Sequence, residues 1–355
     1  MESLTAYKAK IDDNISAYCK TLLQNTESEF GPYSREALET YCSLMARGGK
    51  RIRGGLLMSA YKMAGGKDSK LAVHAARVVE MLNANLLIFD DIADSSDMRR
   101  GGLTVHRMFE RYHSDAKLWG DSPHFGVAMA LHVGLAGTYL TATELEQLDI
   151  PADKKAAVTQ HFNRTVYTAI HGQFNDIANE AVRLVNERQV ERTLTWKSAY
   201  YTFLQPFQVG LLLAGAKDVD IPAVREYSLH LGLAFQITDD ILGTFGDESK
   251  SGKSTREDII EGKITLLVSR ALQRGDGEQK KVLLKALGNK KLTDADYEAV
   301  KDIMRTTGAL DYARDVAAVH EQAATRALNT APKHWSKEGV AFLHNLARYV
   351  TTRQK

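Results

Sequence analysis

The chain contains long stretches in which apolar residues recur every three or four positions, the spacing that gathers them on one face of an α-helix. The clearest are LAVHAARVVEMLNANLLIF at residues 71–89 and YSLHLGLAFQITDDIL at residues 227–242. Stretches that alternate apolar and polar residues between turns, as strands do, are nearly absent. The pattern therefore predicts an all-α protein with roughly ten or more helices.

Glycine, serine and charged residues interrupt this pattern near residues 48–55, 113–123 and 246–256. None of these breaks resembles a domain linker, so we expect one large helical domain over residues 1–355. The stretches at residues 125–140 and 207–216 are the most apolar. The first contains His132 and several glycines, and the second is too short to cross a membrane. We expect both to be buried helices, with no stable membrane insertion.

Composition and charge narrow the function classes. Hydrophobic residues make up 44% and charged residues 25% of the chain, which is typical of a globular protein, and the net charge of +2 gives no global attraction to nucleic acid. The two cysteines, Cys19 and Cys42, are too few for a disulfide framework, so we expect reduced thiols in an intracellular protein. The N-terminal segment lacks the apolar run of a signal peptide, and the expected location is the cytoplasm.

Two of the predicted helices end in acidic residues. We place residues 71–98 on one helix, where Asp90 and Asp94 share a face and Asp91 points about a quarter-turn away. Carboxylates without a nearby His or Cys suit a hard cation such as Mg²⁺, and the alternative is a solvated helix end. Because the preceding residues are all apolar, the helix is expected to be buried, and buried carboxylates need a partner.

The same arrangement recurs in FQITDDILGTFGD at residues 235–247. Asp239 and Asp240 end a second apolar helix, and Gly243 stands where the first cluster has Asp94. Two buried helices that each present carboxylates can face one another across a cavity. Together they can hold several Mg²⁺ ions bridged by a diphosphate.

Basic residues occur in several further segments, including the glycine-flanked turn RGGKRIRGG at residues 47–55. Arginine binds phosphate in a bidentate manner, and glycines let backbone N–H groups approach an anion. The alternatives are solvated basic turns, snorkelling lysines and, after the first acidic cluster, salt bridges to Asp94 or Asp97. The basic residues concerned are Lys50, Arg51, Arg53, Arg99, Arg100, Lys197, Lys253 and Lys263.

In this combination and order the motifs resemble those of the trans-isoprenyl diphosphate synthases, also called polyprenyl synthetases. DDIADSSDMRRGG resembles the first aspartate-rich motif of that family and FQITDDILGTFGD the second, while GGKRIR, HGQFND, WKSAYY and GKSTREDIIEGKIT follow the family order. The resemblance spans about residues 45–270. It implies an all-α bundle around a deep central cavity, a single polyprenyl synthetase domain and a homodimer.

The resemblance also implies roles for individual residues. Asp90 and Asp94 would bind two Mg²⁺ ions and Asp239 a third, with Mn²⁺ able to substitute. The supporting acids would be Asp91, Asp240 and Asp258. The residues implied for the allylic diphosphate and its cavity are Arg99, Gln173, Asp176, Lys197, Ser198, Gln236, Lys253 and Lys263. Those implied for isopentenyl diphosphate are Lys50, Arg53, Asn83 and Arg100, with the basic tail of Arg353 and Lys355 closing over them.

The implied reaction needs no protein nucleophile. Mg²⁺ and basic side chains stabilise the charge on the departing diphosphate, which is electrostatic catalysis. Isopentenyl diphosphate attacks the allylic cation in an apolar cavity, and the released diphosphate takes the proton. Among the departures from the family pattern, Gly243 replaces a frequent Asp, which affects metal affinity, and Asn83 stands where His or Gln is usual.

Product length is expected to depend on residues one and two turns before Asp90, namely Leu82, Asn85 and Leu86. Family members with short products usually have an aromatic residue at the position of Asn85 or Leu86, and neither is aromatic here. The expected product is therefore geranylgeranyl diphosphate or somewhat longer, and Phe at either position should shorten it. Asn85 is unusual in an apolar tunnel, and a place at the dimer interface is the alternative.

Two rival functions share part of this pattern. A class I terpene cyclase has a similar first motif, and its second motif can be aligned with Asp239, Asp240, Gly243 and Asp247. The basic turn at residues 47–55 suggests a second diphosphate site. A cyclase does not need such a site. A non-catalytic subunit of a heteromeric synthase usually lacks acids of the first motif, and these are intact here.

Overall fold

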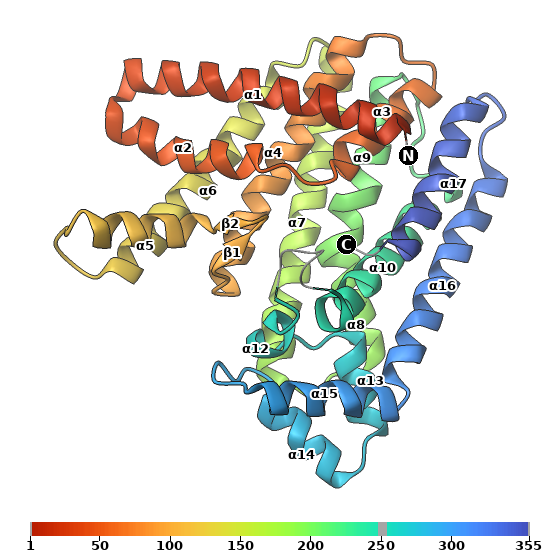
Figure 1. Ribbon diagram of the computed structural model, residues 1–355. Helices are drawn as coiled ribbons and strands as arrows, with labels where there is room; N and C mark the ends of the chain where they lie inside the picture. Colours follow the sequence, from red (N-terminus) through yellow and green to blue (C-terminus); the bar gives the residue numbers. More distant parts are fainter. Residues whose placement is uncertain (1, 248–253, 354–355) are drawn as a thin grey trace. The chain divides into compact units, whose positions relative to one another are not determined.

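A computed structural model describes residues 2–247 and 254–353 and is built from helices, with one short two-stranded hairpin (Figure 1). This confirms the prediction of an all-α protein. Backbone contacts divide the chain into two compact units. Unit 1 comprises Met1–Ser59 and Lys67–Ala156, and unit 2 comprises Ala60–Gly66 and Ala157–Lys355. A single functional domain over residues 1–355 stays a prediction.

Unit 1 begins with two long helices that pack along each other and are joined at Gly31, whose φ of 84° is easily reached by glycine. The central helix α4 packs against α1, α2, α5 and α6. The elements of unit 1 are α1 (Glu2–Phe30), α2 (Pro32–Ala46), most of α3 (Ile52–Met63), α4 (Ser69–Ala93), β1 (Met98–Arg99), β2 (Gly102–Leu103), α5 (Val105–Asp115), α6 (Ser122–Glu146) and the start of α7 (Ala152–Val182).

The helix predicted at residues 71–98 is shorter at its C-terminal end. It begins after Asp68, whose side chain accepts hydrogen bonds from the backbone N–H groups of Lys70 and Leu71. It ends at Ala93 because Ser95 has a φ of 55°, which is outside the α-helical region. The chain then forms the β1–β2 hairpin, so Met98 lies on a strand and the predicted end at residue 98 is wrong.

Unit 2 is organised around α10, which packs along α16 (Figure 1). Buried residues of α8, α10 and α12–α16 form one apolar core that includes Ile237, Leu267 and Met304. The remaining elements of the chain are α8 (Glu187–Leu194), the π-helix η1 (Thr195–Leu204), α9 (Gln205–Leu213), α10 (Pro222–Phe245), α12 (Glu257–Glu261), α13 (Leu266–Arg274), α14 (Gly277–Ala286), α15 (Asp294–Thr306), α16 (Ala309–Ala327), η2 (Leu328–Thr330) and α17 (Lys337–Thr352).

By length and composition alone, α4 and α6 could each cross a membrane. The most apolar part of α4 is 72% buried inside the protein, as in the core helix of a globular fold. The most apolar part of α6 is only 33% buried. The prediction that residues 125–140 form a buried helix is therefore wrong for the single chain. Residues 207–213, at the end of α9, are buried as expected.

The contact between α10 and α16 includes a pair of histidines. Nδ1 of His230 lies 2.8 Å from Nδ1 of His320, and their rings are 5.1 Å apart at the centroids. Burial lowers the pKa of His320 to about 4, with a further contribution from His230, and burial also lowers the pKa of His230. Glu226 opposes the shift of His230 and Arg326 adds to it.

This pair should make the protein less stable in mild acid. Both folded-state pKa values lie below the unfolded value of 6.5, so the unfolded chain binds more protons as the pH falls from about 6.5 to 4. His320→Gln should reduce this loss by about 1–2 kcal/mol after allowance for solvent. Urea unfolding at pH 7.5 and pH 5 measures the difference, and an equal loss in both proteins would contradict the expectation.

Candidate active site

The first acidic cluster lies at the C-terminal end of α4 in unit 1. Asp91 is 1% exposed and accepts a hydrogen bond from Nε of Arg99 at 2.7 Å, and Nη2 of Arg99 also contacts it. Burial alone would lower the pKa of Arg99, but the charges of Asp91 and Asp90 outweigh burial and raise it. Asp90 is more exposed and lies 3.7 Å from Arg99. Asp91 therefore positions Arg99. A salt bridge to Asp94 or Asp97 was the expected alternative, and Arg99 instead pairs with Asp91.

Arg47 holds the hairpin that carries Arg99. Its Nη1 donates to the backbone carbonyls of Arg99 and Leu103, at 2.9 Å in each case, so one guanidinium bridges β1 and β2. Burial lowers the pKa of Arg47, and Asp91 partly opposes this shift. Sequence reasoning did not single out Arg47, although it opens the quoted motif RGGKRIRGG.

The basic side chains of the turn at residues 47–55 differ in their burial. Arg51 is buried and bound by Asp12, by Glu80 and by the carbonyl of Met45, so its role is structural. Gly49 packs against the guanidinium of Arg100, and Lys50 and Arg53 are partly exposed.

The environment of Arg100 is rich in positive charge. Burial, together with the smaller effects of the charges of Arg51, Arg53 and Arg99, lowers the pKa of Arg100 to about 10, and Glu80 opposes this shift. Such crowding of cations favours the binding of an anion.

Of the residues expected to control product length, Leu82 and Asn85 are buried and Leu86 is partly exposed. Asn85 is 1% exposed in the single chain and donates to Oγ1 of Thr141 on α6 at 2.9 Å. Its place in the product tunnel and the alternative, a place facing the dimer interface, both stay predictions. A Cβ on Gly137 would come within 2.3 Å of Oδ1 of Asn85. This close approach leaves no room for a larger side chain at either position. Asn83, expected near isopentenyl diphosphate, is buried in the single chain.

In unit 2 several of the sequence-predicted residues lie in two hydrogen-bonded groups. Asp176 of α7 accepts from Nζ of Lys197 at 2.6 Å and from Nζ of Lys263 at 3.3 Å. Lys263 also donates to Glu180, which sequence reasoning missed although it lies one turn after Asp176. Burial would raise the pKa of Asp176, but the two lysines lower it, so the carboxylate stays charged.

The second group joins Ser198, the residue after Lys197, to α10. Ser198 donates to Oε1 of Gln236 at 2.8 Å, and Nε2 of Gln236 donates to Oδ1 of Asp240 at 3.0 Å. The π-helix η1 carries Lys197 and Ser198, and π-helical segments are frequent at functional sites. A Cβ on Gly172 or Gly232 would lie 2.2 Å from η1, so both glycines are needed for this close packing.

In the second acidic cluster, burial and neighbouring carboxylates disfavour the charged form of Asp240. Burial raises the pKa of Asp240 well above its ordinary value, and the charges of Asp258 and Asp239 raise it further. Oδ2 of Asp240 is buried without a hydrogen-bond partner. A Cβ on Gly243 would lie 2.7 Å from Oδ2 of Asp258, so the Asp258 carboxylate fills the space that the frequent Asp of this motif would need.

Arg353 at the end of α17 provides a cation for this cluster. Its Nη2 lies 2.6 Å from Oδ1 of Asp239 and donates to the carbonyl of Phe235 at 2.8 Å, and its guanidinium stacks 4.0 Å from the ring of Phe235. Arg353 is only 2% exposed at its side chain, whereas Asp239 is 43% exposed. Arg353 therefore pairs with Asp239 of the second acidic cluster, and its expected closure over the isopentenyl diphosphate residues stays a prediction.

The donor chemistry of both clusters fits Mg²⁺. All the acids concerned offer oxygen ligands, and Mg²⁺ takes one or two carboxylates and completes its shell with water or phosphate. Within the described part of the chain, no three acidic, imidazole or thiol groups are gathered as a ready metal cage. Lys253 and Lys355, two further predicted cations, lie outside the described residues.

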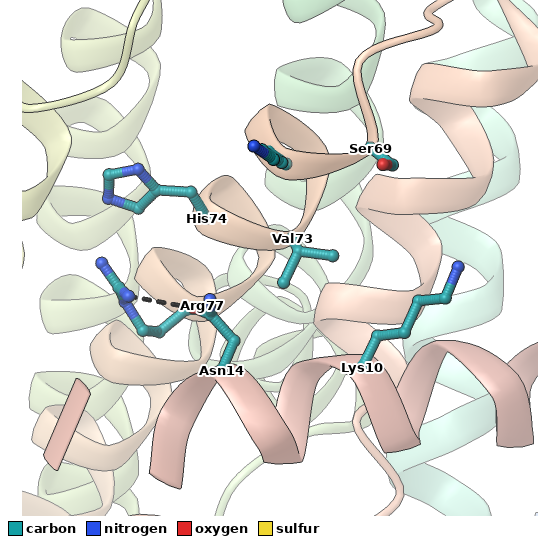
Figure 2. A pocket seen from close by; sticks show the side chains of 7 residues that line it. Lys10, Asn14, Ser69, Val73, His74 and Arg77 are labelled. Atoms are coloured by element: carbon teal, nitrogen blue, oxygen red, sulfur yellow. Dashed lines mark hydrogen bonds between the residues drawn. The ribbon is translucent and has the colours of Figure 1, made fainter. Parts of the chain in front are cut away.

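A separate cavity of about 460 Å³ lies beside α1 and α4, with Lys10, Lys70 and Arg77 among its lining residues (Figure 2). Glu144 of α6 binds Arg77 and lies 2.8 Å from Nε2 of His74, so it neutralises much of this charge. None of the sequence-predicted site residues lines the cavity, which makes it distinct from both acidic clusters.

Residues 35–304 match the family model described as polyprenyl synthetase. The chain is 31% identical over 352 residues to a geranylgeranyl diphosphate synthase of Saccharolobus solfataricus, covering 97% of this chain and 99% of the relative. It is 31% identical over 305 residues to a short chain isoprenyl diphosphate synthase of Methanocaldococcus jannaschii, covering 84% and 86%.

The fold has close counterparts among solved structures. A geranylgeranyl pyrophosphate synthase from Corynebacterium glutamicum, solved with isoprenyl diphosphate and magnesium, superposes with a TM-score of 0.90. The two sequences are 29% identical, and the match covers 97% of this chain and 99% of that one.

Replacing Arg353 should make the second acidic cluster a better cation site. Arg353→Gln removes the positive charge from Asp239, so the substrate-free protein should bind Mn²⁺ about three- to fivefold more tightly. Titration calorimetry measures this affinity, and Arg348→Gln, at an exposed position of the same helix, is the matched control. Weaker or unchanged binding in Arg353→Gln would show that the arginine does not compete with the metal.

Proposed function

Because the chain belongs to the polyprenyl synthetase family, we propose that it is a trans-prenyltransferase that condenses isopentenyl diphosphate with an allylic diphosphate. The condensation is head to tail and gives a longer isoprenyl diphosphate of E configuration. The observation that carries the proposal is that each unit contains a cluster of charged side chains, acidic in unit 2 and basic in unit 1. Carboxylates crowd around Asp240 and cations crowd around Arg100, as metal–diphosphate binding requires.

We assign Mg²⁺ to Asp90 and Asp94 in unit 1 and to Asp239 in unit 2, three ions in all, with Mn²⁺ able to substitute. Bound Mg²⁺ would supply positive charge to the departing diphosphate. Asp240 supports this assignment, because its raised pKa and unpartnered Oδ2 favour a nearby cation. Asp91 acts indirectly by fixing Arg99.

The side chains of the two hydrogen-bonded groups in unit 2 stabilise the leaving group. Lys197 and Lys263 are held by Asp176, so they are already oriented when a diphosphate arrives. Gln236 links Ser198 to Asp240 and fixes both the hydroxyl and the carboxylate. The allylic diphosphate is assigned to Arg99, Gln173, Lys197, Ser198, Gln236, Lys253 and Lys263.

Isopentenyl diphosphate is assigned to the basic turn and its neighbours. Arg100 is the best supported of these residues, because burial and then the charges of neighbouring arginines lower its pKa, and an anion would offset both effects. Lys50, Arg53 and Asn83 complete the assignment. Carbon–carbon bond formation then consumes the allylic cation, and the released diphosphate accepts the proton, so no protein base is required.

A product of geranylgeranyl length or longer is supported by the apolar helix before Asp90. Leu86 is the partly exposed member of the three length-controlling positions, whereas Leu82 and Asn85 are buried. The named relatives make geranylgeranyl or short-chain products. We assign the protein to the cytoplasm, in agreement with its two free thiols.

A homodimer is supported by the surface of α6. Leu131, Leu135 and Tyr139 are four residues apart and are exposed in the single chain, by 50% in the case of Leu135. Such a stripe on a long apolar helix is typical of a subunit interface.

The direct test is incubation with Mg²⁺ and an allylic diphosphate, with and without isopentenyl diphosphate, followed by product masses. A chain extended by whole five-carbon units, formed only with isopentenyl diphosphate, is the expected result. Hydrocarbon formed without it would favour a terpene cyclase. No product from the purified protein would favour a non-catalytic subunit of a heteromeric synthase.

Gly243→Asp should disturb the second acidic cluster, because the new carboxylate would meet Asp258. We expect a loss of stability of about 1–3 kcal/mol and weaker Mn²⁺ binding. Gly243→Asp combined with Asp258→Gly should recover most of both, and Gly243→Ala separates crowding from charge. Denaturant unfolding and calorimetry provide the measurements, and strictly additive effects would contradict the exchange of roles.

Leu86→Phe should shorten the product, because a ring at this position narrows the space that receives the growing chain. The structure limits this test to Leu86, since Asn85→Phe would collide with α6 at Gly137. Product masses provide the measurement, and Lys70→Phe on the exposed first turn of α4 is the control. An unchanged product distribution in Leu86→Phe would remove Leu86 from the length-controlling set.

Leu135→Glu should weaken self-association, because a charge in an apolar interface lacks a partner. Light scattering at micromolar concentration should then give the monomer mass, against a dimer for the parent chain. A monomeric parent chain, or a dimer that is unaffected by Leu135→Glu, would argue against the α6 interface.

A further inference from the structure

The basic turn has a backbone conformation that side chains rarely adopt. The φ angle is 78° at Gly48, 124° at Gly49 and 51° at Arg51. Arg51 carries a side chain, so its left-handed conformation is unfavourable and has to be maintained by contacts. Helix α3 begins at the next residue. The groups that hold Arg51 therefore determine where Lys50 and Arg53, the assigned cations on either side of it, are placed.

Glu80 of α4 reaches this turn from the interior of unit 1. It is 3% exposed, and both of its carboxylate oxygens are engaged. Oε2 lies 3.3 Å from Nη1 of Arg51, and Oε1 accepts a hydrogen bond from the backbone N–H of Gly54 at 3.0 Å. Gly54 lies in the first turn of α3, where backbone N–H groups have no acceptor within the helix. One buried carboxylate thus holds the residues that lie before and after Arg53.

The other contacts of Arg51 are less protected from water or are neutral. Nε of Arg51 lies 2.8 Å from Oδ1 of Asp12, whose side chain is 34% exposed. Nη2 of Arg51 donates to the backbone carbonyl of Met45 at 2.6 Å. Glu80 is therefore the buried carboxylate that balances the buried charge of Arg51, and its loss would leave that charge with a partly exposed partner.

We propose that Glu80 is a positioning residue for isopentenyl diphosphate, because it fixes the basic turn so that Lys50 and Arg53 meet the diphosphate in one geometry. The identity of the anion rests on the proposed function, whereas the hold on the turn rests on the contacts of Glu80 with Arg51 and Gly54. A carboxylate has the wrong sign to bind a diphosphate. Its contribution to binding is therefore made through the residues that it holds.

Charge and position predict opposite effects when Glu80 is replaced. The negative charge of Glu80 acts on Arg100, where it opposes the lowering of the pKa. Removing this charge makes the neighbourhood more positive, so by charge alone an anion would bind more tightly. Releasing the turn instead allows its cations to leave the binding geometry, so the anion would bind more weakly. The direction of the change distinguishes the two effects.

The test is Glu80→Gln in the full chain, with steady-state kinetics measured for each substrate. The amide can still accept from Gly54 but cannot pair with the charge of Arg51. The KM for isopentenyl diphosphate should rise about tenfold, while kcat and the KM for the allylic diphosphate should change by less than about twofold. A lower KM for isopentenyl diphosphate, or equal rises in both KM values, would overturn the proposal.

The matched control is Glu144→Gln. Glu144 is also buried in unit 1 and also pairs with an arginine, but its partners are Arg77 and His74 rather than the basic turn. Both variants should lose stability, and only Glu80→Gln should change the KM for isopentenyl diphosphate. A similar rise of this KM in Glu144→Gln would show that general destabilisation, and not the position of the turn, causes the effect.

A double variant separates positioning from folding. Arg51→Gln combined with Glu80→Gln leaves no unpaired charge of this pair in the interior, so stability should recover relative to Glu80→Gln. The turn is still released, so the KM for isopentenyl diphosphate should stay high. Recovery of this KM together with stability would overturn the proposal.

Hydrogen exchange in the substrate-free protein tests the hold on the turn without turnover. The amides of residues 48–54 should exchange faster in Glu80→Gln than in the parent chain or in Glu144→Gln. A parent chain that makes no product would contradict the proposed function, and the exchange result would still decide whether Glu80 holds the turn. Unchanged exchange at these amides would overturn the inference.

Discussion

The ion pair between Asp91 and Arg99 determines the arrangement of the candidate site in unit 1. Asp91 is almost fully buried, and a buried carboxylate without a partner would cost several kcal/mol. Arg99 meets this requirement only because the helix stops at Ala93 and the chain turns back as a hairpin. Arg47 fixes the hairpin from the opposite side. Asp90 and Asp94 are thereby held at the helix end beside a fixed cation.

Unit 2 is subject to a second constraint, which is repulsion between like charges in a partly dehydrated site. Asp176 keeps Lys197 and Lys263 close together, although the two ammonium groups repel each other. Asp240 and Asp258 crowd the second acidic cluster, and Arg353 is the cation that the chain itself provides there. A diphosphate with its metal ions carries both kinds of charge that these networks favour. Under the proposed function, these charged groups are in place for electrostatic catalysis before any ligand binds.

The departure from the family pattern at Gly243 is explained by a neighbour in space. The second motif lacks an acid on α10, but the carboxylate of Asp258 occupies the adjoining space from α12. Gly172 and Gly232 show the same dependence on packing, since each allows the π-helix to approach without a collision.

The sequence by itself determined the helical fold, the two acidic clusters and the family. These depend on short-range spacing: apolar residues every three or four positions give helices, and acids four apart share a face. The sequence also identified the main candidate cations, because each lies within a contiguous motif. The helix predicted to residue 98 failed because its end depends on a turn that pairs Arg99 with Asp91.

Only the tertiary structure decided which residues pair. Examples are Asp176 with Lys263, Asp258 with the space at Gly243, Asn85 with Thr141 and Arg353 with Asp239. Each joins residues far apart in the chain, so it depends on how closely helices approach and on which charges are buried together. Helical periodicity sets the face on which a side chain lies, but it contains no information about the partner that packing brings to that face.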